Sequence, residues 1–104
     1  MKKYTLYLGL NDQEKKIQLI STLESYKIVE RILKKQGFDG ATIFEAVGLY
    51  KHNDGSFVTE STLRIEILDF EDAYNIKNLV NTLKLVFNQE SIAVQNEQVD
   101  SVLM

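Results

Sequence analysis

The stretch that decides the fold runs from Gly37 to Ile67 and reads GFDGATIFEAVGLYKHNDGSFVTESTLRIEI. It holds two runs rich in β-branched and aromatic residues, 41–51 and 56–68, on either side of the tetrapeptide His52-Asn53-Asp54-Gly55. An Asp-Gly pair between two such runs is a strong signal for a β-hairpin. The sequence therefore predicts two long antiparallel strands joined by a tight turn.

The second run alternates in a way that fixes its faces. Leu63, Ile65 and Ile67 occupy one side of the strand, and Arg64 and Glu66 occupy the other. Side chains of a strand alternate between the two faces of a sheet, so one face is directed to a core and the other meets water or a partner.

The residues before the hairpin predict a strand and a helix. Alternation over 3–10 indicates a first strand, and the polar segment 11–20 is read as a loop. Ser21-Thr22-Leu23-Glu24 has the spacing of a capping box, which starts a helix, and Gly37 supplies its stop. The apolar residues expected on the buried face of this helix are Leu23, Tyr26, Val29, Ile32 and Leu33.

The residues after the hairpin predict a second helix and a fourth strand. Glu71-Asp72 is expected to open the helix, where carboxylates are favoured by free N–H groups, and Asn88 is expected to cap its end. Residues 90–96 form the strand, with Ile92 and Val94 inward. The apolar tail 99–104 is expected to add to a sheet edge or to pack on a neighbouring subunit. The predicted buried stripe of the helix is Ala73, Ile76, Leu79, Val80, Leu83 and Phe87.

This order of elements predicts one α+β domain over residues 1–104, a ferredoxin-like βαββαβ sandwich. Right-handed crossovers place both helices on one face of a four-stranded antiparallel sheet of order 4-1-3-2. The other face is expected to be open and to carry Thr5, Tyr7, Glu60, Thr62, Arg64 and Glu66.

The orientation of the strand 41–51 is left open by its sequence, because Ile43, Val47 and Leu49 compete with Phe44 and Tyr50 for the core side. An outward Phe44 or Tyr50 would place an apolar patch in a polar field, which is typical of a subunit or partner contact. We therefore expect a homodimer, formed through the open face or the edge strand.

The composition of the chain limits the environment and the partners that we expect for it. The chain has 104 residues, 44% hydrophobic and 26% charged, with no cysteine. Net charge is −3, and the half from residue 52 onward carries nine Asp/Glu against three Lys/Arg. An acidic surface of this kind suits a basic partner and disfavours direct binding of nucleic acid. No apolar run is long enough to span a membrane, so a cytoplasmic location is expected.

Candidate chemistry in the sequence is sparse. His52 is the single histidine and is interpreted as a turn residue. Glu45, Glu60 and Glu66 could approach across neighbouring strands, but on an exposed sheet they would pair with Arg64 and lysines. There is no phosphate-binding loop and no dinucleotide fingerprint. The sequence alone therefore predicts a non-enzymatic protein without a cofactor or a metal.

Two motifs resemble the PII signalling proteins and their PII-like relatives. The first is the spacing G-x-x-G-x-T-x-x-E-x-x-G from Gly37 to Gly48, and the second is the segment Leu63-Arg64-Ile65-Glu66-Ile67, which is similar to their third strand. The resemblance covers residues 37–72 and implies a ferredoxin-like fold. It also implies an alternative function, the binding of a small anion or nucleotide between subunits.

Two further resemblances concern small bacterial proteins. Tyr7-Leu8-Gly9 together with Phe87-Asn88-Gln89-Glu90-Ser91-Ile92 is similar to an uncharacterised ferredoxin-like group. The opening KKYTLYLGLND resembles small proteins of plasmids and conjugative elements, among them anti-CRISPR inhibitors of the type II nuclease. That resemblance implies a protein–protein interaction module whose carboxylates contact Lys/Arg surfaces that otherwise hold nucleic acid. The candidate partner-binding residues are Tyr7, Asp54, Glu60, Arg64, Glu66, Asp69, Glu71 and Asp72.

Overall fold

The computed structural model describes residues 1–51 and 54–104 of the chain. Within them, a strand, a helix, two strands, a helix and a strand follow one another. Their bounds are β1 Lys2–Gly9, α1 Thr22–Lys35, β2 Thr42–Lys51, β3 Phe57–Asp69, α2 Ile76–Val86 and β4 Ala93–Gln98.

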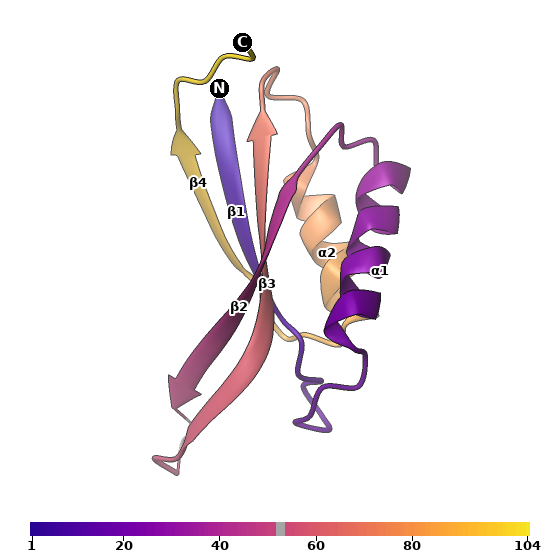
Figure 1. Ribbon diagram of the computed structural model, residues 1–104, viewed down its shortest axis with the longest axis vertical. Coiled ribbons are helices and arrows are strands. Elements are labelled where there is room, and N and C mark those ends of the chain that lie inside the picture. The colour runs from indigo at the N-terminus through magenta and orange to yellow at the C-terminus, as the bar shows by residue number, and fades with distance from the viewer. Residues whose placement is uncertain (52–53) are drawn as a thin grey trace.

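The strands form one antiparallel sheet in the order β2-β3-β1-β4. Both helices lie on the same side of this sheet, and the other side is open (Figure 1). The predicted ferredoxin-like sandwich and its strand order are therefore confirmed. The hairpin formed by β2 and β3 contributes the longest strand, and β3 pairs with a neighbour on each side.

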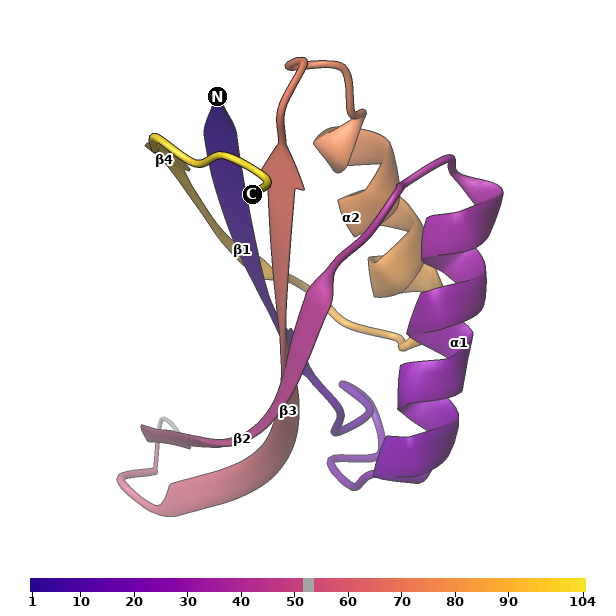
Figure 2. The ribbon, with the colours of Figure 1, turned by 45° about the horizontal axis from the view of Figure 1, so that its top comes forward.

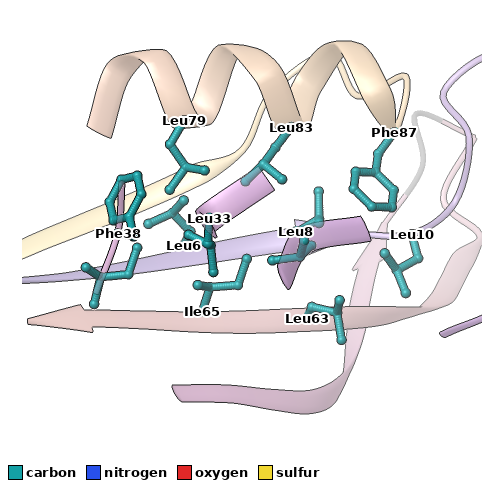
Figure 3. Packing of buried hydrophobic residues seen from close by; sticks show 12 residues of the cluster. Leu6, Leu8, Leu10, Leu33, Phe38, Leu63, Ile65, Leu79, Leu83 and Phe87 are labelled. Carbon is teal, nitrogen blue, oxygen red and sulfur yellow. The ribbon is translucent and has the colours of Figure 1, made fainter. Parts of the chain in front are cut away.

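The core lies between the sheet and the two helices (Figure 3). Leu63, Ile65 and Ile67 of β3 are at most 1% exposed, as the alternation predicts. Leu6 and Leu8 of β1 pair with the first two of them in register and point the same way. Burying a side chain of this size contributes about 1.5–3 kcal/mol. The even-numbered residues of β3 are turned to the open face as a consequence.

Both predicted ends of α1 are confirmed. The hydroxyl oxygen of Ser21, the N-cap, accepts the N–H of Glu24 at 3.1 Å. Gly37 follows the helix with φ +83°, a left-handed conformation that strains any residue with a Cβ. The N–H of Phe38 then donates to the carbonyl of Leu33 at 3.0 Å, which closes the helix end.

The predicted buried face of α1 is only partly correct. Val29 and Leu33 are buried, whereas Leu23 is 64% and Tyr26 is 42% exposed. Ser25 is fully buried instead, because residues 25, 29 and 33 stand four apart and form the stripe that faces the sheet. The apolar periodicity therefore placed two residues of the first turns on the wrong side.

The start of α2 also differs from the prediction. The helix begins at Ile76 after an Asn75 N-cap, and Glu71-Asp72 precede it in a loop. Asp72 adopts φ +54°, a left-handed conformation that a first helical turn excludes. Ala73, predicted as buried, is exposed in this loop.

The end of α2 agrees with the prediction, and the fourth strand is present but begins and ends later in the sequence than predicted. Asn88 adopts φ +49° just after the helix, as expected of a residue that ends it. The strand is Ala93–Gln98 rather than 90–96. Ile92 packs against the core, but Val94 remains 39% exposed because β4 is an edge strand that lies away from the helices (Figure 1).

The register of β2 settles which of its residues face the core side. Phe44 pairs with Arg64 and lies on the open face, and Ile43 packs against the core on the other side. Val47 and Leu49 share the side of Ile43 but are 77% and 65% exposed. The distal half of the hairpin reaches beyond both helices (Figure 1) and bends away from them (Figure 2), which agrees with this exposure.

The hairpin turn is described only in part. The predicted turn role of His52 falls on residues 52–53, which lie outside the described residues. Asp54 follows them, and its carboxylate accepts the N–H of Ser56 at 2.8 Å and the hydroxyl of the same serine at 2.6 Å.

Candidate functional site

A hollow of about 580 Å³ lies where β3 ends. β2 begins at Thr42, which pairs with Glu66, so the last three residues of β3 have β1 on one side and no strand on the other. The connection from α1 to β2 and the loop from β3 to α2 border this gap, and both lie at the same end of the molecule as the chain termini (Figure 1). Leu103 of the tail contributes a further wall.

Tyr74 joins two walls of the hollow. Its ring packs on Phe38 with the centroids 4.5 Å apart. Its hydroxyl donates to Oδ2 of Asp39 at 3.1 Å and accepts the N–H of the same residue at 3.1 Å. These contacts connect the segment before β2 to the loop after β3, although the residues are 35 apart in sequence.

Asp69 forms the base of the loop after β3. Its carboxylate is 1% exposed and accepts the N–H groups of Ala73 and Tyr74 at 2.9 and 3.1 Å. A buried carboxylate with two backbone donors is satisfied by the fold itself. It holds the wall of the hollow and offers no surface to a protein partner.

The lining of the hollow is acidic and apolar. Its acidic residues are Asp39, Glu66, Asp69 and Glu71, and no lysine or arginine lines it among the described residues. The carboxylate of Asp69 is occupied by two backbone N–H groups, which leaves those of Asp39, Glu66 and Glu71. The remaining large side chains of the lining are Leu68, Phe70, Tyr74 and Leu103. Such a lining favours a ligand that combines a positive charge with a flat apolar group, and it repels phosphates.

A second hollow of about 390 Å³ adjoins the first and shares Thr42, Glu66 and Leu68 with it. Its other walls are Lys3 and the tail segment 99–101, which is fixed where the N–H of Val99 donates to the carbonyl of Met1 at 3.1 Å. The two hollows are therefore neighbours at the open end of the sheet, with Thr42, Glu66 and Leu68 between them.

Glu66 lies at the junction of the two hollows, between two cations. Its Oε2 is 3.5 Å from Nζ of Lys3 and 3.6 Å from Nε of Arg64. The guanidinium of Arg64 stacks on the ring of Phe44, 4.2 Å from the centroid. Tyr7 stands opposite Arg64 on β1 and donates its hydroxyl to Gln95. Three of the predicted open-face residues, Tyr7, Arg64 and Glu66, are thus brought together in one polar strip, whereas Thr5 and Thr62 are only 6% and 8% exposed.

The other candidate partner-binding residues lie apart from this strip. Asp54 belongs to the distal hairpin turn. The carboxylate of Glu60 accepts the N–H of Asn11 at 3.0 Å and lies where a Cβ at Gly9 would collide with it. Glu71 lines the larger hollow, and Asp72 pairs with Lys2 at 3.7 Å.

Sequence reasoning missed most of the hollow. The sequence carries no signal that Lys3, Asp39, Phe70 and Tyr74 line a site. They belong to separate segments that only the fold brings together. One signal was present. Gly40 and Thr42 of the G-x-x-G-x-T spacing both line the larger hollow.

Asp12 connects the loop 11–20 to the end of α2. Its carboxylate accepts the N–H groups of Lys15 and Glu14, each at 2.9 Å, and the amide of Asn88 at 3.0 Å. The hydrogen bond from the Lys15 backbone, followed by that from Asn88, holds the pKa of Asp12 below its ordinary value of 3.8. The carboxylate therefore stabilises the fold above pH 3.8, and this contribution is lost as the pH falls through the lowered value.

An Asp12→Asn variant tests the contribution of this carboxylate to stability. The wild type is expected to melt at a higher temperature than the variant near neutral pH, and the difference should shrink as the pH falls below 3.8. Thermal melts followed by circular dichroism across this range check it. A difference that stays constant down to low pH would contradict the assignment.

Two structural absences bear on the site. Across residues 1–51 and 54–104, no group of three or more His, Cys, Asp or Glu side chains is arranged to hold a metal ion. No helix of the described chain is long and apolar enough to cross a membrane.

The chain is thus a ferredoxin-like domain with an acidic and apolar hollow at the end of its central strand. A family model described as "Protein of unknown function (DUF3574)" matches residues 3–102. The chain belongs to this family. A search of the curated proteins gives no match.

Solved structures with this fold include two of an enzyme. A phage SAM lyase in complex with S-methyl-5′-thioadenosine is 26% identical, with a TM-score of 0.72 over 93% of this chain and 80% of the other. The same comparison with a phage SAM lyase in the apo state gives 25% identity and a TM-score of 0.67, over 92% and 78%. CutA1 from Pyrococcus horikoshii OT3 is 17% identical, with a TM-score of 0.60 over 99% and 87%, a likeness of fold alone.

The expectation of a non-enzymatic chain is contradicted by the likeness to the phage lyase. That expectation rested on the lack of recognisable nucleophiles, metal ligands and phosphate loops in the sequence. A depression lined by carboxylates and apolar side chains contains none of these groups, and its residues come from separate segments of the chain.

Proposed function

We propose that this protein binds S-adenosylmethionine (SAM) and cleaves it, with release of S-methyl-5′-thioadenosine. The observation that carries the proposal is the lining of the larger hollow, which combines acidic residues with large apolar side chains and has no lysine or arginine among its described residues. The likeness to a phage SAM lyase at 26% identity supports it. SAM is a sulfonium cation attached to a flat purine, which is the combination that this lining favours.

Electrostatics separates SAM from anionic nucleotides. Two unit charges 4 Å apart interact by about 4 kcal/mol at the effective dielectric constant of a protein surface. The exposed carboxylate of Glu71, which lines the larger hollow, attracts a sulfonium and repels a triphosphate. The apolar side chains of Leu68, Phe70 and Leu103 provide contact area for the purine and the thioether.

The cleavage of SAM needs no further reactant. Release of S-methyl-5′-thioadenosine requires the bond between sulfur and Cγ of the methionyl chain to break, and the sulfur keeps the electron pair. The carbon fragment is completed either by attack of its own carboxylate on Cγ, which forms a lactone, or by loss of a Cβ proton to a base.

In both routes the positive charge on sulfur disappears as the bond breaks. The carboxylates of the hollow therefore bind the substrate more strongly than the transition state, so we assign them the capture and orientation of SAM.

Incubation of the purified protein with SAM tests the proposal. We expect S-methyl-5′-thioadenosine to accumulate in proportion to protein and time, measured by liquid chromatography with a protein-free control for spontaneous breakdown. Unchanged SAM together with no binding of S-methyl-5′-thioadenosine in calorimetry would reject both the activity and the site.

Gly40 offers a steric test of the site. A Cβ built at this residue has no atom within 4 Å, and Gly40 lines the larger hollow, so a larger side chain here is expected to narrow it. A Gly40→Leu variant is expected to keep its melting temperature within a few degrees and to lose ligand affinity by about tenfold or more. Unimpaired binding in a folded Gly40→Leu variant would place the ligand elsewhere.

The PII-like alternative, binding of a small anion or nucleotide, makes the opposite prediction about charge. Calorimetry with ATP and with S-methyl-5′-thioadenosine separates the two functions. Tighter binding of ATP would favour the nucleotide sensor, and tighter binding of the uncharged thioether would favour the adenosyl-sulfur site.

Partner roles inferred from the sequence stay predictions. Self-association through the open face or the edge strand is expected from outward Phe44, and sedimentation velocity with a Phe44→Ser variant tests it. Inhibition of a type II CRISPR nuclease rests on the acidic residues and is tested by a cleavage assay, in which full cutting at excess protein rejects it. A cytoplasmic location and a mobile-element origin stay predictions as well.

A further inference from the structure

We infer that the smaller hollow recognises the amino-acid end of the substrate, with Lys3 as the residue that binds its carboxylate. The inference rests on the proposed function, because it assigns the methionyl end of SAM to the smaller hollow. The two hollows share Thr42, Glu66 and Leu68, so a ligand whose purine fills the larger one reaches the smaller one along the same wall.

The junction of the hollows holds charges of both signs. Lys3 and Arg64 both approach Oε2 of Glu66, at 3.5 and 3.6 Å, so two cations share one carboxylate. The Nε of Arg64 is buried without a hydrogen-bond partner. Asp100 lines the smaller hollow too, on the exposed tail. Glu97 stands opposite Lys3 on β4, and its side chain is exposed. Lys3 therefore lies among carboxylates at the smaller hollow, and a group that carries a cation and an anion together complements this arrangement.

This arrangement matches the methionyl end of SAM. That end carries an ammonium and a carboxylate on one carbon, and the sulfonium lies three bonds away from that carbon. Glu66, at the junction, is placed to accept the ammonium, which releases Lys3 to bind the carboxylate. Lys3 is the cation that lines the smaller hollow among its described residues, whereas Arg64 lies behind Glu66.

S-Adenosylhomocysteine and S-methyl-5′-thioadenosine separate this role from the rest of the site. Both carry an uncharged sulfur and the same adenosyl group, and only the first has the amino-acid end. In calorimetry, a Lys3→Ala variant is expected to bind S-adenosylhomocysteine about tenfold more weakly than the wild type. Its affinity for S-methyl-5′-thioadenosine should change by less than about twofold, and Lys3→Arg should restore most of the loss.

Lys2→Ala is the matched control. Lys2 is the adjacent residue of β1, points to the opposite face and is also ion-paired, to Asp72 at 3.7 Å. We expect it to bind both ligands as the wild type does. Equal losses for both ligands in Lys3→Ala, or an equal loss of S-adenosylhomocysteine affinity in Lys2→Ala, would overturn the role of Lys3. A wild type that binds S-methyl-5′-thioadenosine but gains nothing from the amino-acid end would overturn the inference alone. Failure to bind either ligand would overturn the proposed function with it.

Discussion

A Glu66→Gln variant is expected to lose nearly all SAM cleavage at low substrate concentration. The substitution removes the carboxylate at the junction of the hollows and leaves Lys3 and Arg64 uncompensated beside a cationic ligand. A charge-assisted contact is worth about 1.5–3 kcal/mol, so the affinity for SAM should fall about 10- to 100-fold, with the new repulsion adding to it.

The same variant should discriminate among ligands by their charge. S-Methyl-5′-thioadenosine carries neither a sulfonium nor an ammonium, so its affinity for Glu66→Gln is expected to stay close to that of the wild type. Glu45→Gln is the control, because Glu45 is exposed on the helix side of β2 and outside both hollows. A Glu66→Gln variant that cleaves SAM as fast as the Glu45→Gln control would remove Glu66 from the site.

An Asp69→Ala variant is expected to lose roughly 3 kcal/mol of unfolding free energy. The carboxylate accepts two backbone N–H groups in a place that is 1% exposed, and its removal leaves both donors without their partner. The loop after β3 should loosen with it, because Ala73 and Tyr74 are held there by these two bonds. Ligand affinity should therefore fall together with stability, measured by urea unfolding and by calorimetry.

Asp72→Ala provides the comparison for that loss. Asp72 lies in the same loop, but its pair with Lys2 is exposed and 3.7 Å long, and exposed pairs contribute about 0–1 kcal/mol. Asp69→Asn should fall between the two alanine variants, since it keeps one carbonyl oxygen. An Asp69→Ala protein as stable as Asp72→Ala would contradict the structural role.

The fold could be predicted because its signals are local. The Asp-Gly turn, the alternation around Ile65, the cap at Ser21 and the stop at Gly37 each act over a few residues. The start of α2 could not be predicted in this way. The dipeptide Glu71-Asp72 resembles a helix start. In the structure, the carboxylate of Asp69 accepts the N–H groups of Ala73 and Tyr74, and Asp72 takes a left-handed conformation, so the helix begins later.

The candidate site could be predicted only in fragments. Glu66 and Arg64 follow from the alternation of β3, but the hollow exists because β2 starts at Thr42 and leaves the last residues of β3 without a neighbour. Its walls are joined by Tyr74 and Asp39, which are 35 residues apart. No pattern among neighbouring residues in the sequence predicts that contact. The charge of Asp69 was visible in the sequence, but its burial was not.

The most direct measurement of the central claim is an amide NMR titration with S-methyl-5′-thioadenosine. The largest shifts are expected at Gly40, Thr42, Leu68 and Leu103, which line the larger hollow, while Val47 and Leu49 on the distal hairpin should not move. A saturable set of shifts on the hollow is the predicted result. Shifts confined to the distal hairpin, or none at millimolar ligand, would contradict the assignment of this hollow as an adenosyl-sulfur site.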